Sequence, residues 1–267
     1  FFEVKFNRKN GMLSSYSINN KELIKVPVRF NFRRALTDND RGWKVGEKMK
    51  IWQDAGLCYT VQQFQIISSD KDKTVIKGEY TFTDSKATAT IEHSIFANGT
   101  IKIDYNISIP QDLPNIPRIG LQFEIEKELQ NIDWYGRGPH ENYIDRESGA
   151  AIGIYRTTLN QWTTPYVRPQ ENSNRGGIRW LRFSQGTHQL QFSAVGEPFC
   201  ASAWPYTIST LEQTTHDFEL KMHNNIIVDI DCNQMGVGGD CSWGLPVLQK
   251  YQIKPGKYQY KFIISAK

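Results

Sequence analysis

The sequence predicts an all-β fold in which two antiparallel sheets pack face to face as a sandwich. Many short segments alternate apolar and polar residues with a period of two, which places the apolar side chains of each strand on one face. Turn residues separate these segments at short intervals, as in sandwiches and barrels. Helical patterns are scarce, and a parallel sheet is excluded because its crossover connections need helices.

The clearest strand pattern covers residues 101–109, where isoleucine and tyrosine alternate with polar residues. It ends at Pro110, which cannot donate a hydrogen bond to a sheet ladder. Residues 89–95 alternate in the same way, and Asn98-Gly99 supplies the positive φ angles of a tight turn between them. We therefore expect a β-hairpin here. Further half-buried strands are predicted at residues 190–194, 226–230 and 258–264.

One short helix is predicted, because Ser209 and Glu212 form a capping-box pattern for a helix running to about His216. The segment 110–117 carries three prolines and would join two halves of the fold. A chain of 267 residues with such a connection fits one large two-sheet domain, so residues 1–267 are expected to form a single domain. Residues 1–6 already have a strand pattern without a leader, so we expect a domain cut from a longer chain.

Composition excludes several classes of protein. The net charge of +4 comes from 32 basic and 28 acidic residues without a block of like charges, which argues against nucleic-acid binding. No apolar run approaches the roughly 20 residues of a membrane span. The four cysteines, Cys58, Cys200, Cys232 and Cys241, have no metal-site spacing, so no metal is expected in this chain.

Glycoside hydrolysis usually needs two carboxylates. Glu141 and Asp145 are candidates for such a pair because they lie close together in the sequence. Arg137 and Arg146 flank them, and such a cluster is more typical of a hydrogen-bonded network that fixes a loop. His140 lies beside Glu141 and is the one candidate for general acid–base catalysis. A histidine in a satisfied turn is the simpler interpretation.

The chain contains seven tryptophans, and a tryptophan face can stack on the apolar face of a pyranose. By analogy with aromatic pairs, the gain is about 1 kcal/mol beyond area burial. Most of these residues are expected in the core. Trp243 differs because residues 238–246 have the composition of a tight loop, so it is the candidate for an exposed functional tryptophan.

Several segments together resemble one family, the C-terminal domain of family 2 β-galactosidases, which also occurs as the small chain of two-subunit enzymes. The string of matches is specific because it runs in the expected order from about residue 34 to residue 243. The matching segments are residues 34–40 (R-A-P-x-D-N-D), 52–56 (W-x-x-A-G), 134–146 (W-x-G-x-G-P-x-E-N-Y-x-D-R), 164–177 (T-P-Y-V-x-P-x-E-N…R-x-G) and 234–243 (M-G-x-G-G-D-D-S-W).

This resemblance implies an antiparallel super-sandwich similar to galactose mutarotase. It implies hydrolysis of terminal β-D-galactosides by the full-length enzyme, with both catalytic glutamates in a TIM-barrel domain before this chain. No catalytic residue and no cofactor are then expected here, and any Mg²⁺ or Na⁺ would belong to the catalytic domain. The implied partners are the galactoside, that barrel, and further copies in a homo-oligomer.

The resemblance also implies the site residues. Trp243 matches the tryptophan that packs against the bound sugar or aglycone. Glu171, Asn172 and Arg175 match a loop near that site and are the further substrate-binding residues expected. One departure from the family motif affects Trp243. Cys241 replaces the second aspartate of that motif, and a thiol is a poor hydrogen-bond acceptor. Leu36 in place of proline is a lesser change.

Two alternatives remain at this stage. The chain would be an independent carbohydrate-binding module if several tryptophans were exposed on the sandwich. It would be a mutarotase-like sugar epimerase if a histidine and a carboxylate met in one groove, for which His140 and Glu141 are the only local pair. Adjacent residues on a strand point to opposite faces, which argues against that pair.

Overall fold

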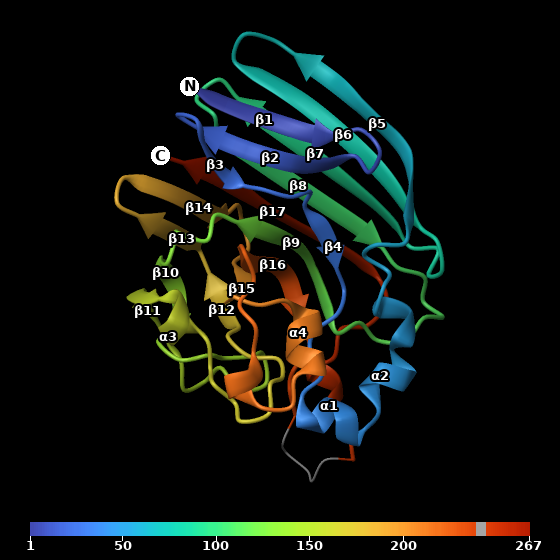
Figure 1. The fold of residues 1–267 in the computed structure, drawn as a ribbon. Coiled ribbons are helices and arrows are strands. Elements are labelled where there is room, and N and C mark those ends of the chain that lie inside the picture. The colour runs from blue at the N-terminus through green and yellow to red at the C-terminus, as the bar shows by residue number, and fades with distance from the viewer. Residues whose placement is uncertain (239–243) are drawn as a thin grey trace.

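The computed structural model describes residues 1–238 and 244–267, and these form two antiparallel sheets (Figure 1). The first sheet has the order β1 (Phe2–Asn7), β2 (Met12–Ile18), β3 (Lys21–Ile24), β9 (Arg118–Ile125), β16 (Ile226–Gln234), β15 (Phe199–Trp204) and β12 (Arg175–Ile178), with β4 (Arg29–Asn31) also on β9. The second has the order β11 (Ala151–Thr158), β10 (Asn131–Gly138), β13 (Trp180–Gln185), β14 (His188–Ala194), β17 (Lys257–Ala266), β8 (Ile101–Ser108), β7 (Thr88–Phe96), β6 (Lys73–Phe82) and β5 (Tyr59–Ser69). The predicted all-β, two-sheet fold is confirmed.

The helices are short and lie in the connections between strands. They are α1 (Asp38–Gly42), α2 (Val45–Lys48), α3 (Leu159–Trp162) and α4 (Ile208–Gln213), with the 3-10 turns η1 (Lys50–Trp52), η2 (Asp217–Glu219) and η3 (Gln249–Tyr251). In Figure 1, α1, α2 and α4 gather at the lower end of the sandwich, opposite the two termini. None of the helices described is long and apolar enough to cross a membrane.

The main core lies between the two sheets. Phe123 of β9 packs against Phe192 of β14 and Phe262 of β17, with ring centroids 5.1 and 6.1 Å apart. Along β16, Ile226, Val228 and Ile230 all belong to this core. Alternation of the strand then turns the residues between them to the other face of the first sheet.

That other face is also covered. Ile227 of β16 packs with Trp204, Ile208 and Leu211 in a second, smaller apolar cluster. Loops and α4 therefore lie over the face of the first sheet that is turned away from the second sheet. Polar residues of β9 and β16 share this covered face with the small cluster, and it is there that both sites described below are found.

The predicted hairpin is confirmed as β7 and β8, with Ile95 opposite Ile101. Its turn differs in detail from the prediction, because Gly99 has a positive φ of 87° whereas Asn98 does not. Asn98 instead accepts a hydrogen bond from the Thr100 amide through its side chain. The proline-bearing segment 110–117 connects β8 of the second sheet to β9 of the first, as expected of a connection between two halves.

The predicted helix exists but its boundaries were wrong. Helix α4 is capped by Thr207, whose hydroxyl accepts from the Thr210 amide, so Ser209 is already within the helix. Glu212 does not reach back to a cap, because it forms an ion pair with Arg33. The helix ends at Gln213, three residues before His216, because the chain returns to an extended conformation at Thr214.

Candidate functional site

Side chains from two of the motifs found in the sequence, 34–40 and 134–146, form hydrogen bonds with residues 235–238 of a third. Arg34 donates hydrogen bonds to the carbonyl oxygens of Met235 and Gly236. Its guanidinium is held by Asp40 at 2.9 and 3.0 Å, and both side chains are fully buried. The motif at 34–40 thus fixes the backbone that leads to residues 239–243.

The motif at 134–146 reaches the same backbone through one aspartate. The Asp145 carboxylate accepts from the Gly238 amide at 2.7 Å. It also lies so close to Gly236 that a Cβ there would meet the carboxylate at 2.6 Å, so this position requires glycine. From the far side, Asn39 donates to the Val237 carbonyl at 3.0 Å. Every residue from 235 to 238 is therefore held by a hydrogen bond from another segment.

A buried cluster of charges lies directly beneath this backbone, centred on Arg118 of β9. Its guanidinium pairs with Glu171 at 3.0 Å, with Asp231 at 3.1 Å, and with Asp229. Gln234 accepts from Arg118 at 2.9 Å and donates to Glu171 at 2.8 Å. The cluster thereby joins β9, β16 and the motif at 164–177 just before the chain leaves β16.

Three carboxylates surround this one guanidinium, and their surroundings determine their charge. Burial raises the pKa of Asp231 well above its usual range, and repulsion from Asp229 and Glu171 adds to that effect. Burial also raises the pKa of Glu171 and of Asp229, although Arg118 opposes both shifts. Burial alone would lower the pKa of Arg118, but the three carboxylates together raise it. Asp231 is thus the carboxyl group of the cluster that most strongly favours its protonated form.

The sequence predicted Glu171, Asn172 and Arg175 as substrate-binding residues, and the structure places all three inside the protein. Asn172 accepts from the Thr164 amide and donates to the Gln170 carbonyl. Arg175 donates to the carbonyl of Trp162 and lies 4.2 Å over its ring. Contact of these three residues with a sugar stays a prediction. Glu171 accepts from Gln234, next to residues 235–238, whereas Asn172 and Arg175 hold backbone groups of residues 162, 164 and 170.

Trp243 and Cys241 lie outside the residues that the structure describes, so the roles expected of them stay predictions. The two ends of that segment are nevertheless held. On the far side, Val247 is buried, and its carbonyl accepts from Gln252 at 2.6 Å. A Cβ on Gly238 would lie 3.3 Å from the Val247 side chain, so Gly238 and Val247 lie close together.

The carboxylates near residue 141 form the network that the flanking arginines predicted. Glu141 accepts from Arg146, from the Tyr166 hydroxyl and, at 2.8 Å, from the Ser173 amide. His140 is exposed, and its side chain makes no hydrogen bond to Glu141. This engagement of Glu141 leaves the pair without the shared groove that sugar epimerisation requires.

The tryptophans of the described residues do not form an exposed platform for sugars. Trp180 is half-buried, and Arg182 lies 5.7 Å over its ring. The others are buried, and they are Trp43, Trp52, Trp134, Trp162 and Trp204. An independent carbohydrate-binding module was favoured by the expectation of several exposed tryptophans. Residues 1–238 do not provide them.

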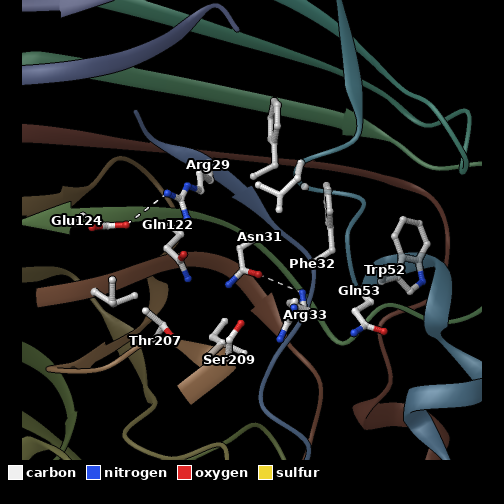
Figure 2. A pocket seen from close by; sticks show the side chains of 15 residues that line it. Arg29, Asn31, Phe32, Arg33, Trp52, Gln53, Gln122, Glu124, Thr207 and Ser209 are labelled. Carbon is white, nitrogen blue, oxygen red and sulfur yellow. Dashed lines mark hydrogen bonds and ion pairs between the residues drawn. The ribbon is translucent and has the colours of Figure 1, made fainter. Parts of the chain in front are cut away.

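A second polar site went unrecognised in the sequence. It is a cleft of about 200 Å³ on the covered face of the first sheet, next to β4, β9 and α4 (Figure 2). Arg29 and Glu124 face each other at 3.5 Å on one side of it, and Ser209 of α4 lies on the other. Arg29 and Glu124 are far apart in sequence and belong to no motif, so no sequence signal pointed to their meeting.

No group of three or more His, Cys, Asp or Glu side chains within residues 1–238 and 244–267 could hold a metal ion. The carboxylates around Arg118 are paired with protein donors instead.

Comparison with known proteins gives a consistent result. The family described as "Beta galactosidase small chain" matches residues 1–264. A β-galactosidase of Priestia megaterium is 33% identical over 253 residues, which cover 94% of this chain and 24% of that protein. A β-galactosidase of Streptococcus thermophilus is 32% identical over 267 residues, covering 99% and 26%. The chain thus spans about a quarter of the length of these relatives.

Among solved structures, a galactose mutarotase related enzyme from Lactobacillus acidophilus superimposes with a TM-score of 0.52. The match covers 100% of this chain and 94% of that one at 9% sequence identity. At that identity the likeness concerns the fold alone. The expected mutarotase-like super-sandwich is confirmed.

Proposed function

Because this chain belongs to the β-galactosidase small-chain family, we propose that it is the non-catalytic part of a β-galactosidase and completes the substrate pocket of a separate catalytic domain. Residues 239–243 would carry Trp243 to that pocket, where its ring packs against the sugar or aglycone of a terminal β-D-galactoside. The two catalytic carboxylates would belong to the catalytic barrel of the same enzyme. Pockets at domain interfaces are a common arrangement.

The observation that carries this proposal is the convergence of the motifs at 34–40 and 134–146 on residues 235–238. Arg34, Asn39 and Asp145 each hold one or two backbone groups there, although they come from two different segments. A loop that only needs to be solvated requires no such bracing. Fixing both ends of a short loop lowers the entropy that its side chain loses on binding a ligand, which is the benefit of preorganisation.

The buried positions of Glu171 and Arg175 fit the same proposal as positioning residues. Glu171 ties the 164–177 motif to Gln234, and Arg175 ties it to the carbonyls of Trp162 and Pro139. Their effect on substrate would then act through the loops that they hold. A direct contact of either side chain with the sugar would need the loop to rearrange.

The test is Trp243→Ala in the whole enzyme. We expect kcat/KM for lactose to fall about tenfold, which corresponds to about 1.4 kcal/mol of transition-state binding, with an unchanged melting temperature. Trp180→Ala is the matched control, since this half-buried tryptophan lies on β13 in the other sheet. Wild-type kinetics in Trp243→Ala, or an equal loss in Trp180→Ala, would contradict the proposal.

A further inference from the structure

The cleft between β4, β9 and α4 contains polar groups that the rest of the protein leaves available. The Arg29 side chain is 47% exposed, and its only partner among the described residues is Glu124. Gln53 and Ser209 are exposed and make no side-chain hydrogen bond within those residues. Figure 2 shows Arg29 and Glu124 on one side of the cleft, with Ser209 and Thr207 opposite them.

Glu124 is held so that one oxygen faces this cleft. Its Oε2 accepts from Asn225 at 3.0 Å and lies 2.9 Å from the His223 ring, whereas its Oε1 is the atom next to Arg29. Burial opposes its ionisation, but the hydrogen bonds from Asn225 and His223 lower the pKa of Glu124 overall. The cleft therefore offers a fixed acceptor beside a guanidinium donor.

The floor of the cleft is fixed by the buried cluster described above. Asn31 and Gln122 both line the cleft, and both donate to Asp229, at 3.1 and 3.0 Å. Phe30, Phe32 and Trp52 supply apolar walls. A rigid floor with a few polar groups converging over apolar walls is typical of a small-molecule site.

The charges of the cleft identify the class of ligand. Arg29 is balanced by Glu124, and Arg33 is balanced by Glu212. An anion would have to break one of these pairs, whereas a neutral polyhydroxylated ligand can use donors and acceptors together. Adjacent hydroxyl groups of a pyranose can donate to the Glu124 carboxylate while accepting from Arg29.

We propose that this cleft is a second, non-catalytic binding site for a single neutral pyranose, either free or at the end of an oligosaccharide. Arg29 and Glu124 bind adjacent hydroxyls from one side, and Gln53 and Ser209, which also line the cleft, bind further hydroxyls. The volume of about 200 Å³ leaves room for one sugar ring rather than a chain. Among the described residues, the lining includes none of residues 235–238 and 244–247.

The test is a sugar titration followed by NMR on the 267-residue chain carrying Trp243→Ala, which separates the cleft from the tryptophan loop. Galactose, lactose and glucose are the probes, and inorganic phosphate is the anionic comparison. We expect at least one of the sugars to bind with a dissociation constant on the order of millimolar, because a ligand this small has few atoms to contribute. Arg29→Ala and Gln53→Ala should each weaken binding by about tenfold.

Arg156→Ala is the matched control, since this arginine lies on β11 with a side chain 80% exposed and also pairs with one carboxylate. It should bind as tightly as its parent. Absence of sugar binding, equal binding by Arg29→Ala, or preferential binding of phosphate would overturn the proposal. If binding required Trp243 and ignored Arg29, the function proposed for the loop would gain support and the cleft would lose it.

Discussion

The Asp145 side chain helps to fix the backbone that leads into the proposed tryptophan loop. Its carboxylate accepts from the Gly238 amide at 2.7 Å and lies against Gly236, where no larger residue fits. In the family pattern a further aspartate stands at position 241, where this chain has Cys241. Among the described residues, Asp145, Arg34 and Asn39 are the side chains that form hydrogen bonds with residues 235–238.

Asp145→Ala should therefore loosen the loop without removing any group that contacts substrate. In the whole enzyme we expect KM to rise several-fold with a smaller change in kcat, and stability to fall by about 1 kcal/mol for the lost hydrogen bond. Asp145→Asn keeps an acceptor oxygen and should restore most of the KM. Equal damage by the two variants, or a change in stability alone, would show that Asp145 is purely structural.

The charge of Asp231 depends strongly on its surroundings. Because its pKa is raised in the folded state, the folded protein retains a proton that the unfolded chain loses above about pH 3.9. Stability linked to this group is thus fully present below that pH and is lost as the pH rises toward the folded-state pKa. One such proton changes the unfolding free energy by up to about 1.4 kcal/mol per pH unit.

Asp231→Asn should remain folded and show a flatter decline of unfolding free energy as the pH rises above about 3.9. Part of the decline should persist, because burial raises the pKa of Asp229 and Glu171 as well. Denaturant unfolding at several pH values measures this pH dependence of the unfolding free energy. An unchanged pH dependence in the variant would mean that Asp231 is ionised in the folded protein.

At the scale of the elements, β16 shows what alternation can and cannot predict. Its apolar residues were identified from the sequence and do face the core. Asp229 and Asp231 would be solvated on a strand with one open face, and only the loops that cover the first sheet bury them. Arg118 was missed for the same reason, since its partners come from β16 and from residue 171. Contacts across more than 50 residues leave no local pattern.

The pairing of β9 with β16 contains a specific fit that can be tested. Gly120 stands opposite Asp231, and a Cβ at Gly120 would lie 1.8 Å from the Asp231 carboxylate. Gly120→Ala should destabilise the fold by about 1–3 kcal/mol, as expected for overpacking in a tight interior. Gly149→Ala is the control, because nothing lies within 4 Å of its added Cβ. Similar stabilities in urea for both variants would contradict this account.

On the scale of the whole molecule, the class of fold followed from strand periodicity and the scarcity of helices. The family motifs added the mutarotase-like architecture, and the role that they imply for Trp243 stays a prediction. Helix α4 was misplaced because Thr207 and Ser209 both suit an N-cap, and the choice between them depends on Arg33, which draws Glu212 away from the cap. The cleft at Arg29 could not be predicted, because it exists only once β4, β9 and α4 are assembled.

The central claim is that this chain completes an active site whose catalytic groups lie elsewhere, and complementation tests it most directly. The 267-residue chain and the remainder of its enzyme are purified separately and assayed alone and mixed, with an aryl β-galactoside. The account predicts no hydrolysis by the chain alone, activity restored on mixing, and weaker restoration by the chain carrying Trp243→Ala. Release of galactose by the chain alone, or full activity of the remainder without it, would contradict the account.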